Sequence, residues 1–210
     1  MGQLLAEQGQ RLAGAELGFV GLGSGALAAY GQPGQKMTFF EIDQASADIA
    51  RDPELFTYLT DSAAQVDVVL GDGRLSLADQ LVGRFDALVL DAFSSDAVPV
   101  HLLTREAVEL YLTRLRQDGL LVFHISNRYL DLAPVVANIA EDVGLEGLIQ
   151  QDPGNDAATG KFASTWVVLS RDAERLEGLA ADQRWQELQE RRTGQRAWTD
   201  DFSNVLGALS

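Results

Sequence analysis

The 210-residue chain contains no cysteine, only two histidines and no long hydrophobic run. The lack of cysteine excludes disulfide bonds and thiolate metal sites, and two histidines without clustered carboxylates predict no metal site. No apolar run approaches the ~20 residues that cross a bilayer, and residues 1–7 lack the basic and apolar regions of a signal peptide. We therefore expect a soluble, cytoplasmic protein without direct membrane insertion.

Basic residues are also scarce, with 16 Lys and Arg against 31 Asp and Glu and a formal net charge of −15. This charge makes nucleic acid a poor partner and favours cationic small molecules, although solubility alone is an alternative reason for it. Hydrophobic residues make up 46% of the chain, which suits the core of one ordinary domain. We expect a single domain with an N-terminal helix over residues 1–16, a core over 17–170 and a helical tail over 171–210.

Glycine is concentrated in one informative stretch. A short apolar run ends in Gly21, Gly23 and Gly25, and a small-residue helical pattern follows over residues 24–30. Glu41 stands twenty residues after Gly21, at the end of the next apolar run. Glycines allow a sharp turn and a close approach of backbone to ligand, and an acid at the next strand end accepts ribose hydroxyls. The spacing predicts an adenosine-nucleoside pocket, with a merely tight turn as the alternative.

Apolar runs typical of strands alternate with helical patterns along the chain. Strands are expected at residues 17–21, 37–41, 66–70, 85–90, 120–125, 145–149 and 165–169. The intervening helices are expected at residues 44–51, 75–81, 104–118 and 132–143. This alternation predicts an α/β fold with a Rossmann-like, doubly wound, mostly parallel sheet in three α/β/α layers.

Polar side chains follow several of these strands at their carboxyl ends, where such sheets bind ligands. In chain order they are Glu41, Asp43, Asp72, Asp91, Asp96, His124, Asn127 and Tyr129. We predict that they converge on one rim. Asp72, next to Gly73, is placed to accept a hydrogen bond from an adenine amine, or else is a turn aspartate. Asp43 is either a pocket residue or only the N-cap of the next helix.

Asp91 carries the chemistry in this interpretation. It follows a run that should be buried, so its carboxylate is partly desolvated and requires a partner. Together with Asp96, five residues on, it forms a pair able to hold an ammonium group and take a proton from an attacking nitrogen. The alternative is that both aspartates cap loop amides. His124 fits a satisfied core histidine as well as a site residue.

The motifs at residues 21–25, 41–43, 71–73 and 91–99 resemble those of the spermidine synthase family, aminopropyltransferases on the class I S-adenosylmethionine-dependent methyltransferase fold. The similarity spans residues 17–170. It is closest to a divergent bacterial branch often fused to membrane segments, which residues 124–130 and 198–201 also resemble.

The resemblance implies decarboxylated S-adenosylmethionine as the donor, with Glu41 on its ribose and Asp72 on its adenine. It implies that Asp91 is the base that activates the amine of putrescine or another polyamine, that Asp96 helps to bind the diamine, and that no metal takes part. The chain departs from the family in having four residues, not two, between Asp91 and Asp96. It also has only 16 residues before Leu17, where the family carries a β-rich domain and a gating segment.

Two other functions are consistent with the same motifs. Methyl transfer from S-adenosylmethionine to a small molecule is the alternative activity. A non-catalytic nucleoside-binding domain of a larger membrane-associated protein is a third interpretation. A homodimer is one alternative for the oligomeric state.

Overall fold

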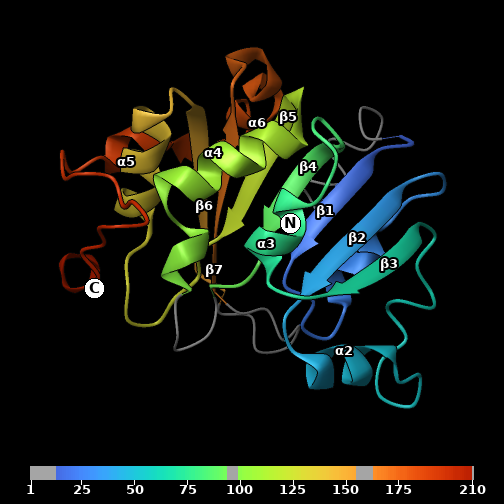
Figure 1. Ribbon diagram of the computed structural model, residues 1–210. Helices are drawn as coiled ribbons and strands as arrows, with labels where there is room; N and C mark the ends of the chain where they lie inside the picture. Colours follow the sequence, from blue (N-terminus) through green and yellow to red (C-terminus); the bar gives the residue numbers. More distant parts are fainter. Residues whose placement is uncertain (1–12, 94–98, 155–162, 210) are drawn as a thin grey trace.

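Apolar side chains occupy both faces of the central strands, so the sheet needs cover on both sides. In β4 (Phe85–Leu90), Leu88 and Leu90 belong to one buried cluster, and Ala87 and Val89 belong to another. The computed structural model describes residues 13–93, 99–154 and 163–209, and it places these clusters on opposite faces of one eight-stranded sheet (Figure 1).

The strand order is β3-β2-β1-β4-β5-β7-β6-β8. The other strands are β1 (Glu16–Val20), β2 (Lys36–Glu41), β3 (Gln65–Leu70), β5 (Leu115–His124), β6 (Glu146–Asp152), β7 (Ser164–Ser170) and β8 (Trp185–Glu187). Pairings from β3 through β5 are parallel, and those among β5, β7, β6 and β8 are antiparallel. The predicted Rossmann-like, mostly parallel sheet is confirmed.

Helices from different parts of the chain cover the two faces. The cluster on one face includes side chains of α3 (Gly73–Ala78), α4 (Arg105–Arg114) and α5 (Ala133–Asp142). The other face is covered by the 3-10 helix η1 (Ala26–Tyr30), α2 (Gln44–Arg51) and α6 (Glu177–Ala180). The shorter 3-10 helices are η2 (Val100–Leu102), η3 (Ala173–Arg175), η4 (Leu188–Arg191) and η5 (Leu206–Ala208).

Three predicted helices have different extents in the structure. The helix expected at residues 75–81 is α3, which spans residues 73–78 and begins directly after its N-cap Asp72. The helix expected at residues 24–30 is only η1, because Gly25 is left-handed (φ 80°) and Gly31 ends the segment, which leaves room for a short 3-10 helix. The helix expected to reach residue 118 ends at Arg114. Leu115 is buried against Phe85 of β4, so the chain enters β5 five residues earlier than predicted.

The tail after residue 171 is only partly helical. It contributes α6 and three 3-10 helices, but residues 185–187 form β8 and extend the sheet beyond β6. The helix predicted near the N-terminus lies outside the described residues, apart from residues 13–16. Within the described ranges, no helix combines the length and apolar character that a membrane crossing requires.

Candidate functional site

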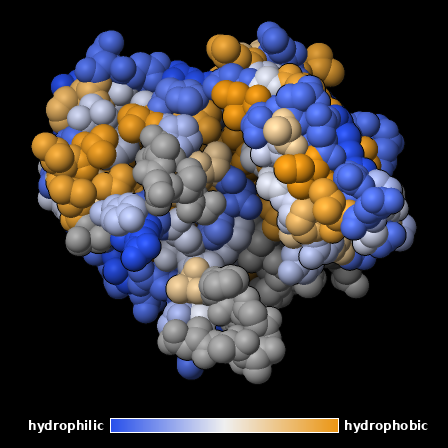
Figure 2. Space-filling view, turned by 90° about the horizontal axis from the view of Figure 1, so that it is seen from below, coloured by the Kyte–Doolittle hydropathy of each residue, from blue (hydrophilic) through white to orange (hydrophobic). Residues whose placement is uncertain are grey.

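A pocket of about 470 Å³ lies beyond the carboxyl ends of β1, β2 and β4. This is the switch point of the sheet, because the chain runs outward from β1 to β3 and then returns to place β4 on the other side of β1. Figure 2 views the molecule from this edge and shows a hollow with hydrophilic surface inside it and hydrophobic surface on both flanks. The fold therefore places a cleft where the sequence predicts a ligand.

The glycine turn after β1 forms one wall of the pocket and is tied to Glu41. Gly21 has φ 96°, and a Cβ placed on it would lie 2.4 Å from the carbonyl oxygen of Asp91. Glu41 is only 8% exposed, and its two carboxylate oxygens accept backbone N–H groups of Leu22 and Asp43 at 2.9 Å each. Each oxygen has a second lone pair, so the carboxylate can still accept hydrogen bonds from a diol.

Gly21 and Gly23 form a matched pair for testing this wall. Gly21→Ala is expected to lower the free energy of unfolding by about 3 kcal/mol, since it adds a backbone clash to a left-handed conformation. Gly23→Ala, with φ 54° and open space around the added methyl group, is expected to cost only about 1 kcal/mol. Urea unfolding of both variants measures the difference, and equal losses would contradict the close contact at Gly21.

Asp72 forms the opposite wall, at the start of α3. Its Oδ1 accepts the N–H of Leu75 at 2.9 Å, and its Oδ2 lies 3.0 Å from Nε2 of His101. Burial acts to raise the pKa of Asp72, but the hydrogen bonds from Leu75 and His101 outweigh it and leave the pKa below its usual range. Gly73 packs so closely on Val20 that a Cβ would lie 2.4 Å from a methyl group. This close packing brings the start of α3 against β1.

The C-terminal tail supports this wall from outside. Arg74 donates from Nη1 and Nη2 to the two carboxylate oxygens of Asp200 at 2.7 Å, and also from Nη1 to the carbonyl of His101. Thr104, the N-cap of α4, donates to Asp200 as well. The hydrogen bond from Arg74 is the main reason that the pKa of Asp200 lies below its usual range. Two residues that are 126 positions apart, Arg74 and Asp200, thus fix the segment around η2 that carries His101.

Asp91 directly follows β4 and faces both the pocket and the neighbouring strand β5. Its Oδ1 lies 2.6 Å from Nδ1 of His124, whose Nε2 lies 2.7 Å from Oγ of Ser126. The side chains of Asp91 and His124 are 28% and 17% exposed. The partner that the sequence analysis required for Asp91 is therefore, in this structure, an imidazole.

Six of the predicted site residues line the pocket together: Gly21, Gly23, Glu41, Asp72, Gly73 and Asp91. His124 reaches the site only through Asp91, as just described.

The other predicted residues lie elsewhere. Gly25 faces Leu59. Asp43 caps α2 by accepting the N–H groups of residues 45 and 46, which is the alternative given for it above. The amide nitrogen of Asn127 donates to the carbonyl of Phe93, and its Oδ1 accepts the N–H groups of residues 129 and 130 in its own loop. Tyr129 is half exposed beside Arg128. Asp96 lies outside the described residues.

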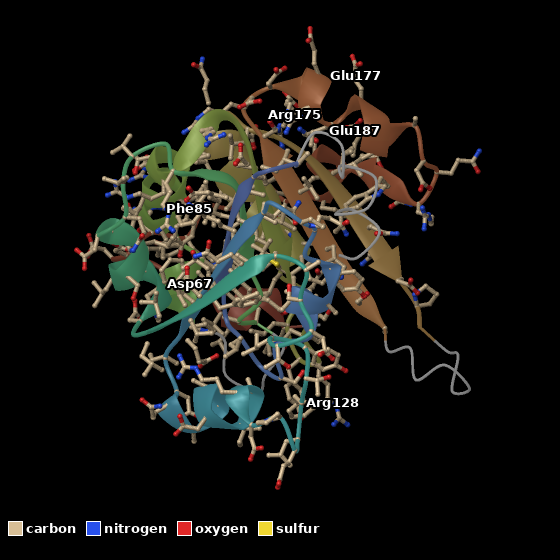
Figure 3. The ribbon with its side chains drawn as sticks, turned by 90° about the vertical axis from the view of Figure 1, so that its right-hand side faces the viewer. Asp67, Phe85, Arg128, Arg175, Glu177 and Glu187 are labelled. Atoms are coloured by element: carbon tan, nitrogen blue, oxygen red, sulfur yellow. The ribbon has the colours of Figure 1, made fainter. Side chains whose placement is uncertain are left out.

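The pocket lining is acidic. Glu41, Asp72 and Asp91 line it, and no lysine or arginine is among the described lining residues. Arg128 lies at the same edge of the molecule as α2 but lines a second pocket, whereas Arg175, Glu177 and Glu187 lie at the opposite edge (Figure 3). No group of three or more His, Asp or Glu in the described ranges has the geometry of a metal site.

Several residues that shape the site were not predicted from the sequence. Ile42 lines the pocket with 72% of its surface exposed, and its place directly after Glu41 was a usable signal. His101 and Asp200 carry no local signal, because their roles arise only when distant segments meet.

Comparisons with known proteins identify the fold. No protein-family model and no curated protein matches the sequence. A probable spermidine synthase from Corynebacterium glutamicum has a TM-score of 0.68 at 16% identity, over 97% of this chain and 81% of that one. The spermidine synthase of Thermotoga maritima has a TM-score of 0.57 at 14% identity, over 93% of this chain and 65% of that chain. This chain therefore spans less than two thirds of the length of the Thermotoga maritima protein.

A predicted O-methyltransferase from Agrobacterium tumefaciens has a TM-score of 0.54 at 18% identity, over 80% of this chain and 78% of that chain. The similarity to the spermidine synthase fold stated from the motifs is thus confirmed at the level of structure. The chain has the fold shared by spermidine synthases and S-adenosylmethionine-dependent methyltransferases.

Proposed function

We propose that this protein is a transferase that moves an aminopropyl group from decarboxylated S-adenosylmethionine to a diamine or polyamine such as putrescine. The observation that carries the proposal is the pocket lining, in which three carboxylates from separate strand ends meet and the described residues include no lysine or arginine. Such a site favours a sulfonium nucleoside that has lost its carboxylate and an acceptor that is a cation.

Each part of the donor has a matching group. The ribose hydroxyls would hydrogen-bond to Glu41, whose oxygens are held in place by two backbone N–H groups. The purine would pack on exposed Ile42, with its amine directed to Asp72. Because His101 now contacts Asp72, it would share that carboxylate with the purine or move aside.

Asp91 would serve the chemical step. The neutral amine nitrogen attacks the propyl carbon attached to sulfur, and the electron pair of the breaking C–S bond goes to sulfur, giving a thioether. The proton released from the attacking nitrogen passes to Asp91. The sulfonium is already an activated leaving group, so the protein's task is mainly to position the amine and accept this proton.

Calorimetric titration with both forms of the donor, followed by an assay with putrescine, tests the proposal. Decarboxylated S-adenosylmethionine is expected to bind roughly tenfold tighter or better, because the acidic lining repels the carboxylate of the ordinary donor. Tighter binding of the carboxylated donor would contradict aminopropyl transfer and favour methyl transfer. Donor binding without turnover over a panel of amines would favour a non-catalytic nucleoside-binding domain.

A further inference from the structure

His124 is held more firmly than a residue that merely lines a cleft. Its backbone is in register with Trp166 across the β5–β7 pairing. The two rings stack with their centroids 4.2 Å apart and an angle of 9° between their planes. The side chain is 17% exposed. The plane of the imidazole is therefore fixed by the sheet itself.

The hydrogen bonds of His124 also fix its protons. An ionised carboxylate only accepts, so Nδ1, 2.6 Å from Oδ1 of Asp91, carries a proton. Ser126 Oγ accepts the backbone N–H of Thr165 at 2.8 Å, which leaves its own proton to donate to Nε2 at 2.7 Å. A backbone amide of β7 thus orients the serine, and the serine selects the Nδ1–H tautomer of the imidazole.

The fixed imidazole in turn restricts the orientation of Asp91. Its backbone N–H donates to Val20 at 2.8 Å and its carbonyl packs on Gly21, so the main chain is fixed. With Oδ1 bound by His124, the carboxylate plane is fixed as well. Among the residues that the structure describes, no hydrogen-bond partner reaches Oδ2. We propose that His124 is a positioning residue that orients Asp91 so that Oδ2 accepts the proton of the attacking group, a role that rests on the proposed transfer.

The order Asp, His, Ser also occurs in hydrolases that use the serine as a nucleophile. Ser126 lines a second pocket, of about 490 Å³, so this alternative has a geometric basis. However, its Oγ already accepts an N–H from Thr165, which pins it to the sheet and reduces its capacity to attack. The geometry favours Ser126 as the group that sets the tautomer.

Two amide substitutions of His124 separate positioning from packing. The nitrogen of His124→Asn can occupy the place of Nδ1 and still donate to Asp91, whereas that of His124→Gln extends toward the place of Nε2. We expect kcat for aminopropyl transfer to fall less than fivefold in the Asn variant and about 100-fold in the Gln variant, with donor affinity unchanged in both. Equal losses of kcat in both variants, or a parallel loss of donor affinity, would overturn the positioning role.

A second measurement does not depend on turnover. The chain has two histidines, so ¹⁵N-histidine NMR yields two imidazoles, and His101→Asn assigns them. The Nδ1–H tautomer of His124 is expected in the wild type, with a change of its nitrogen shifts in Ser126→Ala. An Nε2–H tautomer, or covalent labelling of Ser126 by a fluorophosphonate, would overturn the inference. If the wild type transfers no aminopropyl group, the proposed function fails, while the tautomer still decides whether His124 holds Asp91.

Discussion

Asp91→Asn is expected to lower kcat for aminopropyl transfer by about 10² to 10⁴, the range that a general base contributes. Asparagine has the same shape and keeps an oxygen for His124, but it does not take a proton. The donor contacts assigned to Glu41 and Asp72 do not involve this side chain, so calorimetry should show donor affinity within a few-fold of wild type. Steady-state kinetics with putrescine measures the rate.

A matched control is Asp67→Asn, which changes an exposed aspartate in edge strand β3 (Figure 3). It removes the same charge without altering the pocket and should leave kcat unchanged. An Asp91→Asn enzyme with undiminished rate would remove Asp91 from the proton-accepting role. Equal losses in both variants would attribute the effect to overall charge.

Glu41→Gln is expected to weaken donor binding by about 10- to 100-fold. Each carboxylate oxygen of Glu41 accepts one backbone N–H. In the glutamine variant an NH₂ group replaces one of these oxygens, so two hydrogen-bond donors face each other at that position. Hydrogen bonds to a charged group are worth about 1.5–3 kcal/mol, and each 1.4 kcal/mol is about tenfold in affinity. Calorimetric titration with decarboxylated S-adenosylmethionine measures the loss.

Glu177→Gln is the corresponding control, because Glu177 is exposed at the opposite edge of the molecule (Figure 3). Donor affinity should be the same as wild type in this variant. If Glu41→Gln also bound the donor normally, the ribose would not lie on this carboxylate, and the nucleoside pocket would have to be placed elsewhere.

Local sequence patterns predicted the parallel half of the sheet well. The bounds predicted for α2 and β4 agree with the structure, because they depend on features that are local in the sequence. These features are the N-cap Asp43 for α2 and a short apolar run for β4. The entry into β5 at Leu115 was missed because it depends on pairing with Phe85. The three residues of β8 are too short to show a period, and they become a strand only by pairing with β6.

The same distinction between local patterns and long-range contacts applies to the site. The convergence of Glu41, Asp72 and Asp91 follows from strand ends meeting at one edge, so sequence alone was enough to predict it. The contacts that tune these carboxylates were not predictable. His101 meets Asp72 only because η2 folds back over α3, and His124 meets Asp91 only because β4 and β5 are neighbours. Side-chain pairing across strands has no local signature.

The most direct test of the account is the structure of the protein in complex with methylthioadenosine, the nucleoside product of aminopropyl transfer. We predict the ribose hydroxyls on the carboxylate of Glu41, the purine beside Ile42 and Asp72, and the sulfur facing Oδ2 of Asp91. A nucleoside bound away from Glu41, or with its sulfur remote from Asp91, would contradict the account.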